Sequence, residues 1–83
     1  MFTAYVIYSE KFDKIYVGFT SNIEARLHSH NSSKNTGWTK SFQPWVLFYK
    51  ETYPTKKEAM AREKSLKSYR GREFIRSLIP KKE

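Results

Sequence analysis

The residues best suited to chemistry in this sequence are two tyrosines, one arginine, one histidine and one glutamate. Glu63 has the most unusual position among them. With about 100° of rotation per residue in a helix, it falls inside the apolar stripe that Ala59, Met60 and Leu66 would form. A carboxylate on such a stripe is costly unless a cation, a bound metal ion or protonation compensates its charge. Two interpretations follow: an edge residue that reaches solvent or pairs with a lysine, and a metal ligand.

Arg26 and His30 lie four residues apart in a segment with helical periodicity, so their side chains share one face beside Ile23 and Leu27. A guanidinium next to an imidazole is a poor stabilising pair, because both groups are cations once the imidazole is protonated. The same pair is well suited to binding and polarising a phosphate. A plain amphipathic surface helix is the alternative interpretation.

Tyr5 and Tyr16 fall in two neighbouring segments with the composition of strands. Each is ordinary when taken singly, since tyrosine is common in half-buried strands and this chain has six. The chain has no Walker loop, nucleophile elbow, HExxH zinc motif or cluster of carboxylates. A two-metal nuclease is therefore disfavoured, because such a site needs several carboxylates.

These residues must be positioned by a small α+β domain. Aromatic and β-branched residues predict strands, and the periodic segments between and after them predict helices. The expected order is ββαβαα, with strands over 2–8, 14–20 and 45–53, helices over 22–30, 56–69 and 72–79, a long loop over 31–43, and Pro80 as the final stop. This order predicts a three-stranded antiparallel sheet flanked by helices. The apolar first half of the 45–53 strand favours a central place for it.

Helix boundaries are predicted from capping patterns. Ser21 with Glu24 and Thr55 with Glu58 have the spacing of capping boxes, in which each side chain satisfies a free backbone N–H of the other residue. Gly71 is expected to end the second helix.

The charge balance favours a polyanionic partner. Lys and Arg number 16 against 8 Asp and Glu, which gives a net charge of +8, and nucleic acid is the commonest intracellular polyanion. Residues 34–83 carry the whole excess, because residues 1–33 contain three basic and three acidic side chains. The absence of cysteine excludes disulfides and cysteine-bound metal centres. We expect one domain over 1–83, in the cytoplasm and with no membrane partner, since no apolar run or leader peptide indicates otherwise.

Several short blocks, in order, resemble one known family. They are Thr3-Ala4-Tyr5, Tyr16-Val17-Gly18, Arg26 followed by His30-Asn31, Pro44-Trp45, and Arg62-Glu63-Lys64. Together they resemble the GIY-YIG nuclease domain over nearly the whole chain, most closely its small stand-alone bacterial members. The resemblance implies a sheet with the first strand in the middle, and we adopt that order over the one favoured by the apolar pattern.

The resemblance also implies site roles. Tyr5, Tyr16, Arg26 and His30 would be catalytic, and Glu63 would bind one Mg²⁺ or Mn²⁺ ion. Such an ion keeps most of its water and phosphate ligands, so one carboxylate can hold it. Which of Tyr5, Tyr16 and His30 acts as the base stays open.

The expected function is a metal-dependent endonuclease that hydrolyses DNA, with branched or damaged DNA as candidate substrates, a protein partner as a candidate source of specificity, and no small-molecule cofactor. The expected DNA contacts are basic or aromatic residues of the loop and later helices: Lys34, Trp38, Lys40, Lys64, Lys67, Arg70 and Arg72. The first alternative is a nucleic-acid-binding module of the same fold that is catalytically weak or inactive. The second is a protein-interaction domain.

Overall fold

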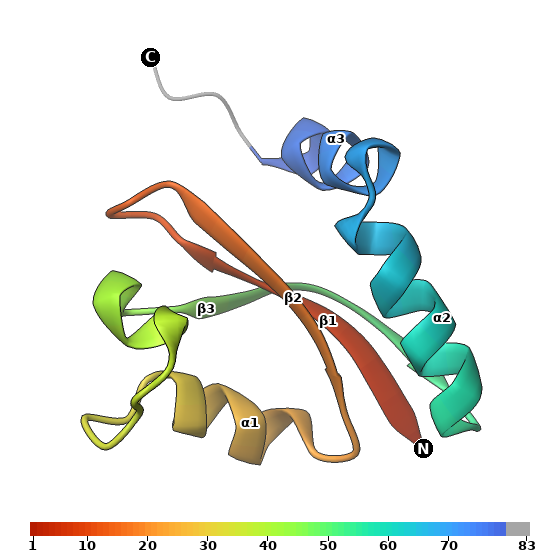
Figure 1. Cartoon of the computed structure of the whole chain (residues 1–83), viewed down its shortest axis with the longest axis horizontal. Helices are drawn as coiled ribbons and strands as arrows, with labels where there is room; N and C mark the ends of the chain where they lie inside the picture. Colours follow the sequence, from red (N-terminus) through yellow and green to blue (C-terminus); the bar gives the residue numbers. More distant parts are fainter. Residues whose placement is uncertain (80–83) are drawn as a thin grey trace.

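The computed structural model describes residues 1–79 as a three-stranded sheet with helices on both faces (Figure 1). The elements in chain order are β1 (Phe2–Ser9), β2 (Lys14–Thr20), α1 (Ile23–His30), the short 3₁₀ helix η1 (Trp38–Phe42), β3 (Val46–Tyr53), α2 (Lys56–Lys67) and α3 (Tyr69–Leu78). The predicted α+β class and the order ββαβαα are confirmed; the expected stop at Pro80 lies outside the described residues. No helix within residues 1–79 is both long enough and apolar enough to span a membrane.

The sheet has the strand order β2-β1-β3, and both neighbouring pairs are antiparallel. The central position of β1 agrees with the family resemblance. The apolar pattern around Trp45 was misleading, because β3 is an edge strand. Trp45 itself precedes β3 and is only 2% exposed, so its burial reflects packing under the loop rather than a central strand.

The two faces of β1 belong to two separate hydrophobic clusters, because side chains alternate along a strand. Figure 1 shows α1 on one side of the sheet and α2 and α3 on the other. On the α1 side, the buried members are Tyr5, Ile7 and Trp45, with Ile23 and Leu27 of α1 packed against them. On the α2 and α3 side, the buried members are Ala4, Val6, Val17, Leu66 and Ile75.

Helix α1 begins one residue later than its predicted cap implies. The Asn22 Oδ1 atom accepts a hydrogen bond from the Ala25 backbone N at 3.1 Å, so Asn22 and not Ser21 is the N-cap. The predicted Ser21–Glu24 capping box is therefore wrong. Asparagine caps a helix as well as serine does, and two cap-forming residues in succession made the choice ambiguous from the sequence.

The start of α2 matches its predicted cap. The Thr55 hydroxyl accepts a hydrogen bond from the Glu58 backbone N at 3.3 Å and donates one to the Glu58 carboxylate at 2.9 Å. This arrangement satisfies one of the backbone N–H groups that every helix leaves free at its start.

The boundary between α2 and α3 differs from the prediction. Helix α2 ends at Lys67, and Ser68 caps the start of α3 by accepting a hydrogen bond from the Gly71 backbone N at 3.2 Å. Gly71 therefore lies inside α3 and does not stop α2. Its lack of a side chain serves close packing, since a Cβ there would lie 2.3 Å from the Ser65 carbonyl oxygen.

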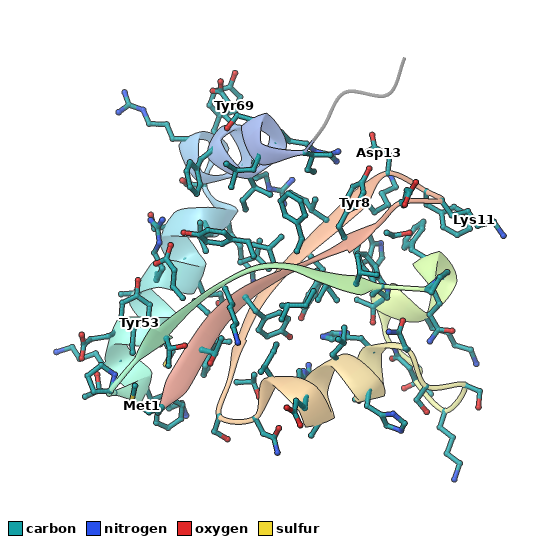
Figure 2. The ribbon with its side chains drawn as sticks, turned by 180° about the vertical axis from the view of Figure 1, so that it is seen from behind. Met1, Tyr8, Lys11, Asp13, Tyr53 and Tyr69 are labelled. Atoms are coloured by element: carbon teal, nitrogen blue, oxygen red, sulfur yellow. The ribbon has the colours of Figure 1, made fainter. Side chains whose placement is uncertain are left out.

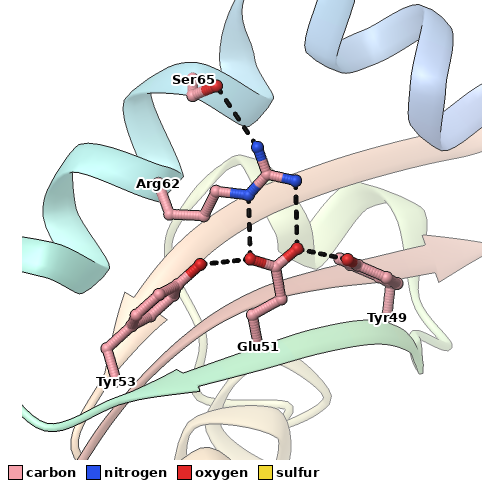
Figure 3. A network of polar contacts seen from close by, with 5 residues as sticks. All are labelled: Tyr49, Glu51, Tyr53, Arg62 and Ser65. Atoms are coloured by element: carbon pink, nitrogen blue, oxygen red, sulfur yellow. Dashed lines mark hydrogen bonds and ion pairs between the residues drawn. The ribbon is translucent and has the colours of Figure 1, made fainter.

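A polar network fastens α2 to the edge strand β3 (Figure 3). The Arg62 guanidinium donates to both Glu51 carboxylate oxygens, at 2.9 and 3.0 Å. The hydroxyls of Tyr49 and Tyr53 donate to the same carboxylate from either side. These donors outweigh the effect of burial and lower the pKa of Glu51 to about 2.

A second polar contact joins the β1–β2 hairpin to α3. The Arg76 guanidinium of α3 donates to an Asp13 carboxylate oxygen at 2.7 Å and to the Asp13 carbonyl at 3.1 Å. The Tyr8 hydroxyl donates to the same carboxylate oxygen at 2.9 Å, and Figure 2 shows Tyr8 and Asp13 together at the end of the β1–β2 hairpin. The hairpin turn is thereby held against α3.

Replacement of Gly71 by alanine is expected to destabilise the fold by about 1–3 kcal/mol, the usual cost of overpacking. In an ordinary helix interior, the same change stabilises by about 1 kcal/mol. Here the added Cβ would also lie 2.5 Å from the Leu66 Cα, and the two helices would have to separate. Urea denaturation of Gly71→Ala beside Glu73→Ala, an exposed α3 position, measures the difference; an increase in stability for Gly71→Ala would contradict the close contact.

The Glu51 network is expected to contribute acid-sensitive stability. Because folding lowers the pKa of Glu51 from 4.5 to about 2, its contribution is complete above pH 4.5 and is lost as the pH falls toward about 2. Glu51→Gln should cost about 1.5–3 kcal/mol at neutral pH, the range for hydrogen bonds to a charged group. As the pH falls, the melting temperature of the Glu51→Gln variant should approach that of the parent protein. Glu73→Gln controls for the loss of one charge, and a constant difference across the pH range would refute the network's role.

Candidate active site

A cleft of about 240 Å³ opens where β2, α1 and the following loop meet. The side chains that line it are Tyr16, Arg26, Ser29, His30, Asn35, Trp38 and Thr39, together with Gly37. Three of the predicted catalytic residues thus share one cleft. The fourth, Tyr5, lies directly beneath it in β1.

Tyr5 is held in the floor of the cleft by a histidine. Its hydroxyl lies 2.9 Å from the His30 Nε2 atom, and both residues are buried. Tyr5 pairs across the strands with Gly18, where a Cβ would lie 2.6 Å from the tyrosine hydroxyl. The glycine of the Tyr-Val-Gly block therefore leaves the space that the Tyr5 hydroxyl occupies.

Tyr16 completes an aromatic group at the cleft wall. It pairs with Ile7 on β1, two positions along from Tyr5, so both tyrosines lie on the same face of the sheet. The ring centroid of Tyr16 lies 4.9 Å from that of His30 and 6.4 Å from that of Tyr5. On its other side, Tyr16 stacks on Trp38 at 6.5 Å.

Arg26 brings the positive charge of the cleft. The neighbouring tyrosines raise the pKa of its guanidinium, Tyr5 more than Tyr16. Burial raises the pKa of Tyr5 above its usual 10.0, although the adjacent Arg26 opposes the increase. Tyr5 is therefore a neutral phenol at neutral pH unless further positive charge enters the cleft.

His30 is the only titratable group of the cleft with a pKa moved downward. Burial and the nearby Arg26 charge both lower the pKa of its imidazole below 6.5. Neutral His30 therefore predominates at neutral pH. A neutral imidazole has one N–H donor and one nitrogen acceptor, so its two ring contacts must differ in kind.

Glu63 lies on α2 at the boundary of the buried stripe. Its side chain is 21% exposed, and its carboxylate pairs with Lys67 Nζ at 3.5 Å. The position of Glu63 therefore matches the first of the two interpretations, an edge residue that reaches solvent or pairs with a lysine. Glu63 does not line the cleft that holds Tyr16, Arg26 and His30; it lines a separate hollow on α2, and its charge makes only a minor contribution to the raised pKa of Tyr5.

The donors around Glu63 fit a single hard cation and not a pair. Among residues 1–79, no group of three or more His, Cys, Asp or Glu side chains is arranged to hold a metal ion. Mg²⁺ is commonly bound through one carboxylate, with water and substrate phosphate as its other ligands. The partly exposed Glu63 carboxylate meets that requirement, with Lys67 as a competitor for its charge.

A second cleft of about 380 Å³ continues from the first along β2 toward α2 and α3. Tyr16 and Trp38 line both clefts, and Lys67 and Arg72 line the second one. Trp38 is 53% exposed despite its size. Because the two clefts share Tyr16 and Trp38, we refer to them together as the β2 groove; Arg26 lines the first cleft, and Lys67 and Arg72 line the second.

Of the predicted DNA contacts, the structure brings Trp38, Lys67 and Arg72 together in the β2 groove. Lys64 lies beside Glu63 in a shallow hollow on α2. Lys40 donates to the Ser33 carbonyl at 3.1 Å and braces the loop. Lys34 is exposed on the same loop, and Arg70 is exposed near the start of α3.

Sequence reasoning missed the residues that hold the loop over 31–43 in place. Asn31 accepts from the Trp45 backbone N at 2.7 Å and donates to the Trp45 carbonyl at 2.9 Å. Gln43 donates to the His30 and Ser32 carbonyls. Asn35 and Thr39 bond to each other and to His30. The four-residue spacing of Asn35 and Thr39 is a weak signal, because polar pairs at this spacing are ordinary in a polar loop.

Comparisons with known proteins agree with the resemblance stated from the sequence. The family model of the GIY-YIG catalytic domain matches residues 1–74. The UPF0213 protein SH2523 of Staphylococcus haemolyticus is 37% identical over 68 residues, which cover 82% of this chain and 83% of that protein. The solution NMR structure of the UPF0213 protein BH0048 from Bacillus halodurans matches with a TM-score of 0.54 and 30% identity, over 94% of this chain and 85% of that chain.

Tyr5→Phe is expected to destabilise the protein by about 1–3 kcal/mol, because it leaves a polar nitrogen of buried His30 without its partner. Tyr16→Phe is the matched control. It removes a hydroxyl from a partly exposed ring, where water can replace a lost contact, and should change stability by less than about 1 kcal/mol. Thermal unfolding of both variants at neutral pH tests the difference. Equal losses would contradict the buried Tyr5–His30 bond.

Proposed function

The chain belongs to the GIY-YIG catalytic domain family, and on that premise we propose that it is a metal-dependent nuclease that hydrolyses phosphodiester bonds in DNA. One observation carries the proposal. Tyr16, Arg26 and His30 from β2 and α1 line one cleft, and the buried Tyr5 of β1 contacts His30 through its hydroxyl. Packing alone does not account for an arginine and a histidine gathered around two tyrosine hydroxyls.

Arg26 is the group proposed to bind the scissile phosphate. Its guanidinium stays charged at all accessible pH values, since its pKa is raised by the neighbouring tyrosines. A guanidinium can hold two phosphate oxygens at once, and its attraction grows as negative charge builds up in the transition state. Its place in the cleft is fixed by α1, whose apolar face carries Ile23 and Leu27 into the core.

The reaction proposed is an attack by water on phosphorus. The water oxygen forms a new bond to phosphorus while the bond to the leaving ester oxygen breaks, and the bond electrons remain on that oxygen. A base of the cleft takes the proton of the water, and solvent returns a proton to the leaving oxygen. Tyr5, Tyr16 and His30 are the candidates for that base.

Glu63 is the residue proposed to hold Mg²⁺ or Mn²⁺. The ion, when bound, supplies positive charge that stabilises the pentavalent phosphate and the leaving oxygen. A cation at Glu63 would also offset the carboxylate charge, which otherwise raises the pKa of Tyr5. Lys67, the ion-pair partner of Glu63, would then be free to contact phosphate.

The β2 groove is proposed as the DNA-binding surface. Lys67 and Arg72 provide cations at one end, and Trp38 provides an exposed ring beside Tyr16. Phosphate contacts of this kind release counterions, so binding should weaken steeply with salt. We further propose that the DNA is branched or damaged and that a protein partner supplies the specificity.

A nucleic-acid-binding module without useful catalysis is the second candidate. The observation that favours it is the Glu63–Lys67 pair, which occupies the one carboxylate proposed for the metal ion. DNA binding through the β2 groove would not depend on that carboxylate. The two candidates therefore differ in what Glu63 does.

The proposal predicts cleavage that requires Glu63 and a divalent ion. Supercoiled, nicked and branched DNA, with an RNA hairpin as a further arm, should be incubated with the protein in Mg²⁺ or Mn²⁺. Glu63→Gln should slow cleavage at least about 100-fold, since both metal charge and its placement are lost. DNA affinity should persist in that variant, because the cations of the β2 groove remain.

Glu73→Gln on the exposed face of α3 is the control, because it removes the same charge from a side chain that lines neither cleft. Equal cleavage by the Glu63 and Glu73 variants would refute the metal role of Glu63. Tight, salt-sensitive binding of DNA with no turnover by the parent protein would establish the binding module instead.

A further inference from the structure

The two tryptophans of the chain have opposite surroundings. Trp45 is 2% exposed, and its indole N–H donates a hydrogen bond to the Thr39 carbonyl oxygen at 2.7 Å. Trp38 is 53% exposed and lines both clefts of the β2 groove. Packing therefore accounts for the position of Trp45, but it leaves about half of Trp38 uncovered by residues 1–79.

The part of Trp38 that is covered rests on other aromatic rings. The ring centroids of Phe42, Trp45 and Tyr16 lie 4.6, 6.0 and 6.5 Å from that of Trp38. The next residue, Thr39, is 4% exposed and is held through its carbonyl by the Trp45 indole. Trp38 is thus fixed from the protein side, and its open surface is a flat apolar patch at the groove.

The charges around this patch are all of one sign. Arg26 lines the first cleft together with Trp38, and Lys67 and Arg72 line the second cleft with the same ring. Of the described residues that line the two clefts, none is acidic. A matching occupant needs flat apolar groups and negative charges in alternation. A nucleotide chain has this composition, because each flat base is flanked by phosphates, and proteins that hold such chains combine cations with aromatic rings in the same way.

We propose that Trp38 forms a base-stacking subsite of the β2 groove, in which one nucleobase lies on the indole ring. Arg26 in the first cleft, and Lys67 and Arg72 in the second, then contact phosphates of the same strand. The inference rests on the proposed DNA-binding function and deepens it, because it assigns this contact to the base and not to the phosphate. Every base has an aromatic face, so the subsite is tolerant of sequence.

The subsite selects DNA by the accessibility of its bases. Inside an intact duplex, both faces of a base pair are covered by its neighbours, and no face is free to lie on Trp38. The cost of taking a base out of the stack is smallest for a mismatched, damaged or already unpaired nucleotide. Branch points and damaged positions therefore fit the subsite better than intact duplex does.

The base contact can be separated from the phosphate contacts with two strands of equal charge. One is a thymidine oligonucleotide of about 12 nucleotides, within the range of site sizes for such grooves. The other, the baseless strand, is a tetrahydrofuran-phosphate chain of the same length. Binding is measured by fluorescence anisotropy in EDTA, which keeps divalent ions from supporting cleavage. The parent protein should bind the thymidine strand at least about 5-fold more tightly, the least that one stacked base provides.

Trp38→Ala should weaken binding of the thymidine strand about 5–150-fold and leave binding of the baseless strand unchanged. Trp38→Phe, which keeps a smaller ring, should recover part of the loss. Tyr69→Ala is the matched control, because Tyr69 is 79% exposed and lines neither cleft. Thermal unfolding checks that the variants are folded. A Trp38→Ala variant that loses no affinity, or loses it equally for both strands, overturns the proposal.

The salt dependence of binding distinguishes stacking from charge. Arg72→Gln should reduce the slope of log affinity against log salt by about 0.7, the value for one single-strand phosphate contact. Trp38→Ala should leave that slope unchanged, since it removes no phosphate contact. A reduced slope in Trp38→Ala would show that Trp38 acts through the phosphates and would overturn the stacking role.

Trp38 also reports the contact in the parent protein, because a stacked base quenches indole fluorescence. The thymidine strand should quench the emission and the baseless strand should not. In Trp38→Phe, Trp45 is the remaining tryptophan, and the quenching should disappear; quenching that persists there overturns the proposal. Equal affinity of the parent protein for the two strands refutes the subsite alone, whereas binding of neither strand refutes the DNA-binding surface and the subsite with it.

Discussion

The rest of the structure depends on β1 being paired on both edges and buried on both faces. It is bonded to β2 on one side and to β3 on the other, and residues Ala4 to Ile7 are at most 1% exposed. A shift of one residue in its pairing would move Tyr5 to the α2 side and place Val6 under α1. The register that places Tyr5 opposite Gly18 is therefore set by the two cores, and the cleft inherits its geometry from them.

Much of this fold follows from local patterns in the sequence. The strands and the α2 cap were correctly predicted because β-branched runs and the Thr55–Glu58 pair act over a few residues. Helix boundaries that depend on contacts between residues distant in the sequence were not correctly predicted. Gly71 looks like a helix stop in isolation, and only the proximity of Ser65 explains its place inside α3. The strand order could be predicted only from the family resemblance. Central strands are more buried than edge strands, but the apolar content of a strand does not determine which of the two it is.

The candidate site, like the fold, could be predicted from the sequence only in part. The resemblance selected the four side chains that meet in the cleft, and the comparisons support the family behind it. The supporting loop could not be predicted, because its side chains bond to backbone groups brought near only by folding. Asn31 and Trp45 are 14 residues apart in sequence yet form two hydrogen bonds. Charge patterning indicated a basic second half, but not which cations face the β2 groove.

The bonds that brace the loop over 31–43 have a consequence for the energetics of recognition. Asn31, Asn35 and Gln43 together tie it to the backbone at His30, Ser32, Gly37 and Trp45. One wall of the β2 groove is thus ordered before any ligand arrives, and its conformational entropy is lost during folding. A bound strand then has to restrict mainly its own motion and that of exposed side chains. Under the proposed function, this preorganisation would lower the entropic cost of binding a DNA strand in the β2 groove.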